Sequence, residues 1–170
     1  NPDCVAKNVK KFTHFVSRDA MNIDGLSEET LEKFIDNGFI KEYADIFKLD
    51  RYEEEIVNMS GFGKRSYEKI TKAVNDSREV ELPNFIYSLG ILNIGLANAK
   101  LICSAYEYDY DRVVNAKQEE LVQIDKIGEV IANSYVSYFA NEKNAKEIEN
   151  LLKEINFREV QKADTQSDIA

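Results

Sequence analysis

The sequence predicts an all-α protein built from four copies of one short helical unit. Three observations support this fold class. A pattern of apolar-x-Gly-apolar-Gly recurs in more or less eroded form, with central positions 36, 32 and 33 residues apart, and such a near-constant step indicates an internal repeat. A stretch with the helical spacing of apolar residues follows each copy. No segment shows the long β-branched alternation of strands, and the 170 residues include only 7 glycines and 2 prolines.

Each copy of the pattern predicts a tight turn that leads into a helix. We expect these helices over residues 28–35, 64–74, 96–105 and 129–139. This combination is typical of the helix-hairpin-helix motif. Because a lone motif cannot bury its apolar face, we expect four helix-hairpin-helix motifs arranged as two pseudo-two-fold pairs. The turns, called hairpins one to four, are Ile23-Asp24-Gly25-Leu26-Ser27, Met59-Ser60-Gly61-Phe62-Gly63, Ile91-Leu92-Asn93-Ile94-Gly95 and Ile124-Asp125-Lys126-Ile127-Gly128.

The two glycines of the pattern have different physical roles. The first lets the chain turn sharply after a helix, where a positive φ is often needed. The second opens the next helix and has no side chain that would hold a phosphate away from the amides at the helix N-terminus. The apolar residues pin each hairpin to the core. The predicted phosphate-binding residues are therefore Gly25, Leu26, Ser27, Gly61, Phe62, Gly63, Lys64, Arg65, Asn93, Ile94, Gly95, Lys126, Ile127 and Gly128.

The four hairpins are not equivalent, since only hairpin two keeps both glycines. Hairpin one has Ser27 in the second glycine position, and serine is a good N-cap. Hairpin three has Asn93 in the first position, where asparagine tolerates a positive φ better than most residues. Hairpin four has Lys126 there, which carries a backbone cost but adds a positive charge. We expect the closest phosphate contact at hairpin two, because Lys64 and Arg65 follow it directly.

The chain divides at changes in this pattern. A segment around Pro83 interrupts the repeat, and proline breaks or starts a helix. The predicted parts are a basic lead-in (residues 1–18), motifs one and two (19–77), motifs three and four (78–140), a closing amphipathic helix (141–156) and a disordered tail (157–170).

Charge is unevenly distributed along the chain. The net charge of −9 counts against a uniformly basic surface for nucleic acid, but leaves room for a local basic face. On a helix, residues 65, 69 and 72 share one face, which suits contact with a phosphate backbone. Acidic residues concentrate at 28–32, 53–55, 107–111 and 142–154. Positive residues cluster at Lys7, Lys10, Lys11, His14 and Arg18, and again at Lys64, Arg65, Lys69 and Lys72.

Other features of the sequence exclude several classes of protein. No apolar run approaches the roughly 20 residues of a membrane span, and the polar start is no signal peptide. The absent initiator Met suggests a fragment or a processed product. Cys4 and Cys103 make no disulfide framework, and the apolar spacing around Cys103 predicts a buried core position. His14, the single histidine, has no second ligand nearby.

Longer segments of the chain resemble a known family. His14 to Leu26 resembles the stretch after the zinc finger in bacterial NAD-dependent DNA ligases. Asn1 to Cys4, followed by Val5-Ala6, resembles the end of that four-cysteine finger. Ala44-Asp45-Ile46-Phe47-Lys48-Leu49 resembles the family's Ala-Asp-Leu-Tyr-x-Leu, and Phe85 to Ile91 resembles its Leu-Leu-Phe-Ala-Leu-Gly-Ile. The resemblance runs from residue 1 to about residue 156.

The resemblance implies a function for the parent enzyme. That family joins a 5′-phosphate to a 3′-hydroxyl at nicks in duplex DNA during replication and repair, using NAD to adenylate a lysine, with magnesium assisting. For this chain it implies a binding domain that grips nicked double-stranded DNA, without sequence preference, from the minor-groove side. The other ligase domains would be its partners. It further implies a monomer in the cytoplasm, associated with the nucleoid in use, and no membrane.

Departures from the family pattern limit what this chain should do alone. Asn22-Ile23-Asp24-Gly25 is the nearest string to the adenylation signature Lys-x-Asp-Gly, and asparagine stands where the nucleophilic lysine would be. We therefore expect no catalytic residue and no ligation by this chain. Cys4 is the single remaining ligand of an incomplete zinc site, and a structural zinc needs four. NAD, magnesium and zinc are expected only for the full-length parent.

Two other functions stay open from the sequence. A glycosylase or lyase on a helix-hairpin-helix scaffold would use a catalytic Asp or Lys, for which Asp76 or Asp109 could be nominated without an evident partner. A protein-interaction scaffold with degenerate hairpins would fit the net charge of −9. Release of free base from damaged DNA would favour the glycosylase or lyase. DNA binding that is absent, or that salt does not affect, would favour the scaffold.

Overall fold

The computed structural model of the chain describes residues 2–160, and describes side chains from residue 8 onward. Most of this part is helical, which confirms the all-α prediction. The elements are α1 (Pro2–Val16), α2 (Glu28–Asp36), the 3₁₀ segment η1 (Tyr43–Tyr52), α3 (Glu53–Val57), α4 (Lys64–Asp76), β1 (Glu79–Val80), α5 (Leu82–Ser88), α6 (Leu96–Ala105), α7 (Tyr110–Val114), α8 (Gln118–Leu121), α9 (Glu129–Ala140), α10 (Glu142–Leu152) and β2 (Asn156–Phe157).

The helices that follow the four hairpins begin at the predicted residues. Each begins there because the residue before it has an extended backbone and takes the N-cap position. The ends of α2, α4, α6 and α9 lie within two residues of the predicted ends. The four N-caps are Ser27, Gly63, Gly95 and Gly128.

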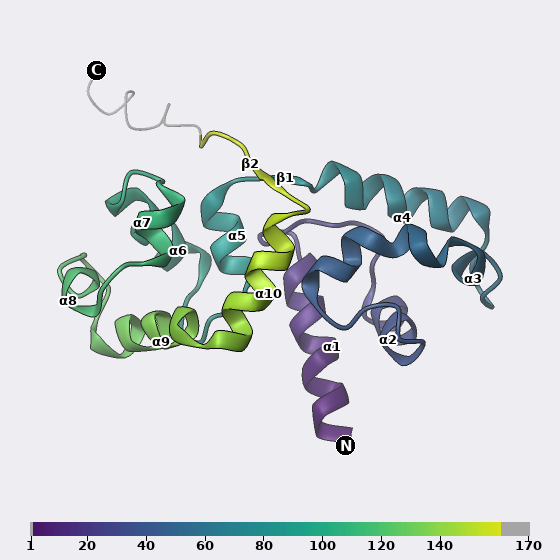
Figure 1. The fold of residues 1–170 in the computed structure, drawn as a ribbon, viewed down its shortest axis with the longest axis horizontal. Coiled ribbons are helices and arrows are strands. Elements are labelled where there is room, and N and C mark those ends of the chain that lie inside the picture. Colours follow the sequence, from purple (N-terminus) through teal and green to yellow (C-terminus); the bar gives the residue numbers. More distant parts are fainter. Residues whose placement is uncertain (1, 161–170) are drawn as a thin grey trace.

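The molecule is elongated, and the two pairs of motifs lie at its two ends (Figure 1). The half at the right of the view contains α2, η1, α3 and α4, and the half at the left contains α6 to α9. Helices α1, α5 and α10 lie between them. One hydrophobic cluster joins all three regions and includes Phe34 from the first half, Phe15 from α1 and Tyr135 from the second half. The two halves therefore share one core.

Helix α1 is a core element as well as a basic segment. Phe12 and Phe15 are almost fully buried, and the Phe15 ring stacks on Tyr43 with centroids 4.3 Å apart. His14 Nε2 donates a hydrogen bond to the Tyr87 carbonyl oxygen at 2.7 Å, so the imidazole has a structural partner. Lys11 Nζ lies 2.6 Å from a Glu147 carboxylate oxygen and ties α1 to α10.

The C-terminal segment corrects one prediction. The sequence predicted a disordered tail from residue 157, but Phe157 lies in β2, which pairs in parallel with β1. The Phe157 ring packs 5.1 Å from Phe85 and 5.4 Å from Tyr110, between ring centroids, and this stacking holds the strand in place. Two-residue strands with partners far apart in sequence carry no recognisable alternation. Residues 161–170 lie outside the described part, so the tail prediction stays untested there.

The closing helix is also shorter than predicted. Helix α10 ends at Leu152 rather than at residue 156. The chain leaves the helix there because Ile155 is buried and the Asn156 amide donates to the Arg78 carbonyl at 2.7 Å. Within the described residues, no helix has the length and apolar character that crossing a membrane requires.

Cys103 is a buried core residue, as its apolar neighbours predicted. Burial raises the pKa of its thiol to about 12, because the apolar surroundings disfavour the thiolate. Such a thiol is a poor nucleophile at neutral pH, so Cys103 contributes packing rather than chemistry.

Candidate nucleic-acid interface

All four hairpins make the same left-handed turn. The first glycine position has a positive φ in every copy: +90° at Gly25, +84° at Gly61, +69° at Asn93 and +71° at Lys126. In hairpins two to four, the next amide closes the turn onto the carbonyl three residues earlier, as in Phe62 N to Met59 O at 3.0 Å. A positive φ at the third residue is the requirement of a type II turn. The predicted role of this position is confirmed, including at the two non-glycine residues.

The apolar residue in each turn points into the protein. Leu26, Ile94 and Ile127 are buried, and Phe62 is half-buried with its ring 5.8 Å from that of Phe34. The amides of Phe62, Ile94 and Ile127 are already used within the turns. These residues shape the hairpins, and neither their side chains nor these amides are free for a ligand.

The amides at the start of the four helices differ in how they are capped. In hairpin one, Ser27 Oγ accepts from the Thr30 amide at 3.2 Å. In hairpin three, Asn98 Oδ1 accepts from the Gly95 amide at 3.1 Å. The Gly95 amide precedes the helix, so in the described part of the chain no side chain caps the first amides of α4, α6 or α9. The first amides of these three helices therefore have unused hydrogen-bonding capacity.

The charged residues in the first turn distinguish these uncapped helices from one another. The first turn of α9 contains Glu129, and that of α2 contains Glu28 and Glu29. Carboxylates there complement the helix dipole and repel a second anion. The first turn of α4 has no acidic residue and instead begins with the exposed cations Lys64 and Arg65. The first turn of α6 has neither an acidic residue nor a Lys or Arg. Hairpin two alone among the four therefore combines uncapped amides, a first helical turn without carboxylates and adjacent positive charge.

Comparison with known proteins agrees with this geometry. Residues 17–76 match a family described as a SAM-like helix-hairpin-helix tandem, and residues 84–148 match a helix-hairpin-helix motif family. A DNA ligase of Lachnoclostridium phytofermentans is 55% identical over 163 residues, which are 96% of this chain and 25% of that protein. A DNA ligase of Ruminiclostridium cellulolyticum is 46% identical over 161 residues, 95% of this chain and 24% of that protein.

A third DNA ligase, from Fusobacterium nucleatum, is 38% identical over 151 residues, 89% of this chain and 22% of that protein. The chain belongs with the helix-hairpin-helix region of DNA ligases. It spans about a quarter of the length of these relatives.

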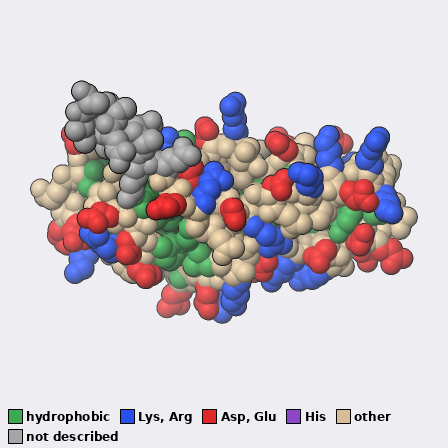
Figure 2. All heavy atoms as spheres, turned by 90° about the horizontal axis from the view of Figure 1, so that it is seen from above, with side chains coloured by type: hydrophobic (Ala, Val, Ile, Leu, Met, Phe, Trp, Pro, Cys, Tyr) green, Lys and Arg blue, Asp and Glu red, His purple; other side chains and the backbone are tan. Residues whose placement is uncertain are grey.

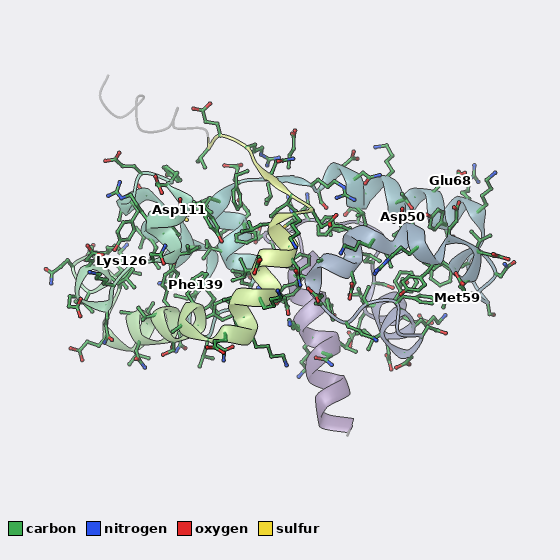
Figure 3. The ribbon with its side chains drawn as sticks, viewed as in Figure 1. Asp50, Met59, Glu68, Asp111, Lys126 and Phe139 are labelled. Carbon is green, nitrogen blue, oxygen red and sulfur yellow. The ribbon has the colours of Figure 1, made fainter. Side chains whose placement is uncertain are left out.

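The hairpins of this ligase region are paired in the same way in each half. A Cβ at Gly25 would lie 3.5 Å from Ile70 Cγ1, so hairpin one rests on the helix that follows hairpin two. Asn93 Nδ2 donates to Ser134 Oγ at 3.4 Å, so hairpin three rests on the helix that follows hairpin four. Met59 and Lys126, which mark hairpins two and four, lie at opposite ends of the long axis (Figure 3).

A basic cleft extends the surface of hairpin two. The exposed residues Arg65, Lys69 and Lys72 follow one face of α4, as the sequence predicted. Lys69 and Lys72 line a cleft of about 460 Å³ together with Arg18 and Arg158. Lys and Arg side chains gather, with acidic residues among them, over the half that contains α4 (Figure 2, right). The fold thus brings Arg18, from the first basic cluster of the sequence, to the same cleft as Lys69 and Lys72 of the second.

Acidic residues limit the charge of this cleft. Asp24, Asp76 and Glu79 also line it. Asp76 lies 2.9 Å from Lys72 Nζ, and this hydrogen-bonded pair raises the pKa of Lys72. The positive surface is therefore strongest at Lys64 and Arg65 and weaker toward the far end of α4. Sequence reasoning missed Arg158, because only the β1–β2 pairing brings it to this cleft.

The remaining candidate residues have structural roles in the described region. Asp109 Oδ1 accepts from the Arg112 amide at 3.0 Å and caps α7, while Asp76 pairs with Lys72. Neither aspartate is arranged as a catalytic group. The described residues contain no cluster of three or more His, Cys, Asp or Glu that could hold a metal ion. The Cys4 side chain lies outside the described residues, so its predicted role is untested.

Proposed function

We propose that this chain is the duplex-DNA-binding region of an NAD-dependent DNA ligase. It would grip the phosphate backbone from the minor-groove side, without sequence preference, so that the parent can seal nicks. The observation that carries this proposal is the start of α4, where uncapped amides meet Lys64 and Arg65. Helix N-termini bind phosphate through such amides and the helix dipole. Contacts to phosphate position a protein on DNA but carry no sequence information.

The proposal assigns the ligation chemistry to other parts of the parent. The adenylation signature Lys-x-Asp-Gly is absent from this chain, and the nearest string, Asn22-Ile23-Asp24-Gly25, belongs to hairpin one. The chain's described residues form no metal-binding cluster, and we assign it no step that uses magnesium, zinc or NAD. The chain would act as a monomer beside the other ligase domains, at the nucleoid in the bacterial cytoplasm.

The decisive experiment is binding of the chain to a nicked and an intact fluorescent duplex over a salt series. Contacts to about four to six phosphates release counterions, so log K should fall with log[salt] with a slope of roughly −4 to −5. Both duplexes should bind with similar affinity whatever their sequence. No binding at low salt, or binding that salt leaves unchanged, would contradict the proposal.

A protein-interaction scaffold is the second candidate. The carboxylates at the start of α2 and α9 favour it, because Glu28, Glu29 and Glu129 repel phosphate. A scaffold would show no salt-dependent DNA binding in the same titration, and would instead associate with another domain of the parent.

Gly63 offers a test of amide binding that leaves the turn intact. Its backbone is extended (φ 178°), and a Cβ there would meet no atom within 4 Å, so Gly63→Val should fold normally. The added side chain should nevertheless crowd a phosphate at the first amides of α4. We expect DNA affinity to fall about tenfold, which corresponds to about one lost charge-assisted hydrogen bond.

Gly128→Val is the matched control for this variant. Gly128 is the N-cap of α9, and a Cβ there also meets nothing within 4 Å. Because Glu129 follows it, we expect a much smaller loss of affinity. Equal losses in the two variants, measured by the same titration with thermal unfolding as the check of folding, would contradict the special role of hairpin two.

A further inference from the structure

Helix α10 connects the two halves of the molecule. Asn141 alone separates it from α9, and Asn144 Nδ2 of α10 donates to the Tyr138 carbonyl of α9 at 3.1 Å, so α10 is attached to the second half. Helix α10 also packs against η1 of the first half, and Figure 1 shows it between the two halves. The contacts of α10 with the first half therefore bear directly on how the halves are placed relative to each other.

Three half-buried polar residues lie along one face of α10 and the turn that follows it. Their spacing of three and four residues places them on that face, whereas the neighbouring residues Lys146, Glu149 and Lys153 are exposed. A polar side chain that is removed from water costs free energy unless it finds a partner. The polar face of α10 consists of Glu147, Asn150 and Glu154.

Glu147 connects this polar face to α1 and η1. A Glu147 carboxylate oxygen lies 2.6 Å from Lys11 Nζ of α1, and the Glu147 side chain is only 13% exposed. The same Lys11 Nζ lies 4.5 Å from the ring centroid of Tyr43, a buried residue of η1. Lys11 is therefore held between a carboxylate of α10 and an aromatic ring of the first half, which both attract its charge.

Asn150 and Glu154 add two further points of contact with the first half. Asn150 Nδ2 donates to Oε1 of Glu42, the N-cap residue of η1, at 2.9 Å. Arg78, which follows α4, donates to a Glu154 carboxylate oxygen at 3.2 Å. The polar face thus has three partners along about 10 Å of helix. Because hydrogen bonds are directional, these contacts fix both the position and the rotation of α10 against the first half.

We propose that Glu147 and Asn150 are positioning residues, which set the spacing between the two hairpin pairs so that both bind one duplex. This inference rests on the proposed function and names the residues that make the two halves act as one binding surface. The shared core opposes separation of the halves, but apolar contact is non-directional and leaves their angle poorly fixed. A fixed spacing raises the effective concentration of the second hairpin pair once the first is bound.

The test variant combines Glu147→Gln with Asn150→Asp and leaves the net charge unaltered. The first change removes the counterion of Lys11, and the second places a carboxylate against that of Glu42. In the nicked-duplex salt titration, the two halves should then contact fewer phosphates at the same time. We expect the slope of log K against log[salt] to become less negative by about 1, and affinity at about 0.1 M salt to fall about tenfold.

Glu149→Gln with Asn141→Asp is the matched control for this variant. It makes the same two exchanges at exposed positions of α10 and its N-cap. Asn141 Oδ1 accepts from the Asn144 amide at 3.0 Å, and an aspartate keeps that oxygen. Glu149 lies 4.0 Å from Lys146 in an exposed pair, which contributes little. The control should bind DNA with the affinity and the salt slope of the unaltered chain.

A distance measurement separates positioning from stability. Spin labels at Glu68→Cys in α4 and Ser137→Cys in α9, both exposed positions, would report the spacing of the two halves by pulsed electron resonance. The labelled proteins would carry Cys4→Ser and keep the buried Cys103. We expect a narrow distance distribution for the unaltered chain and a broader one for the test variant, at a temperature where circular dichroism shows full helix content. A purely stabilising role would lower Tm and leave the distribution narrow.

The outcomes separate this inference from the proposed function. An unchanged affinity and slope in the test variant, or a distance distribution that stays narrow, would overturn the inference. Equal losses in the control would also overturn it, because charge on α10 rather than its contacts would then be responsible. If the double variant does not fold, Glu147→Gln alone takes its place. If the unaltered chain binds no DNA at low salt, the proposed function fails, and the distance distribution alone decides whether the polar face fixes the spacing.

Discussion

Replacing Lys64 and Arg65 together by alanine should weaken DNA binding more than any other exposed change in this region. Both side chains are exposed at the start of α4, beside amides that no described side chain caps. Each removed phosphate contact makes the slope of log K against log[salt] less negative by about 0.9. The slope of the double variant should therefore be less negative by about 2. At 0.1 M salt this loss corresponds to about a 60-fold lower affinity, equal on all sequences.

The measurement is the salt titration of both proteins on one nicked duplex. Lys146→Ala with Lys153→Ala is the matched control, since it removes the same charge from exposed positions in and just after α10. That control should shift affinity only slightly. If the Lys64→Ala/Arg65→Ala variant has the same slope of log K against log[salt] as the unaltered chain, hairpin two does not contact the phosphates.

Local chemistry explains why much of the site was predictable from the sequence. The four helix starts followed from N-cap residues and the positive φ of the turn, which depend only on neighbouring residues. Asn93 and Lys126 illustrate this point, because each adopts the left-handed conformation that its place in the repeat required. The prediction that hairpin two makes the closest phosphate contact also came from residues adjacent in the chain, Gly63, Lys64 and Arg65, and it stays a prediction.

Contacts between distant residues explain what the sequence did not reveal. The two-residue strand that holds Phe157 depends on a partner strand that begins at Glu79. The cleft that Arg18 and Lys69 both line exists only once the turn after α1 lies close to α4. The 74% exposure of Leu92 could not be predicted either, because an apolar residue beside a turn is equally compatible with a buried core position. Arg78, in a segment that seemed only to interrupt the repeat, is the clearest case.

Arg78 connects three parts of the molecule through one side chain. Its guanidinium donates to the Glu154 carbonyl at 2.9 Å, to the Glu154 carboxylate at 3.2 Å and to the Phe47 carbonyl at 2.9 Å. Its Nε donates to Asn75 Oδ1 at 3.0 Å. The end of α4, the segment η1 and the residues after α10 are therefore joined at one half-buried cation. Its backbone carbonyl also accepts from the Asn156 amide beside the β1–β2 pair.

Arg78→Ala should therefore lower stability more than loss of a surface ion pair. The change leaves two backbone carbonyls and the mostly buried Glu154 carboxylate without their donor, which should cost about 2–3 kcal/mol. For a domain of this size, that cost corresponds to a Tm lower by about 6–10 °C. Lys146→Ala, which removes only an exposed pair with Glu149, should shift Tm by less than about 2 °C.

Loss of Arg78 should also affect how the two halves act together. Two hairpin pairs bind one duplex tightly only when their spacing is fixed, since a fixed spacing raises the effective concentration of the second contact. Arg78→Ala should speed hydrogen exchange at the Asn156 and Arg158 amides, which pair with the β1 segment, and lower affinity for nicked DNA with Lys64 and Arg65 intact. Unchanged exchange together with an unchanged Tm would show that the halves are held by the shared core alone. A lower Tm with full DNA affinity would instead show that each half binds DNA independently of the other.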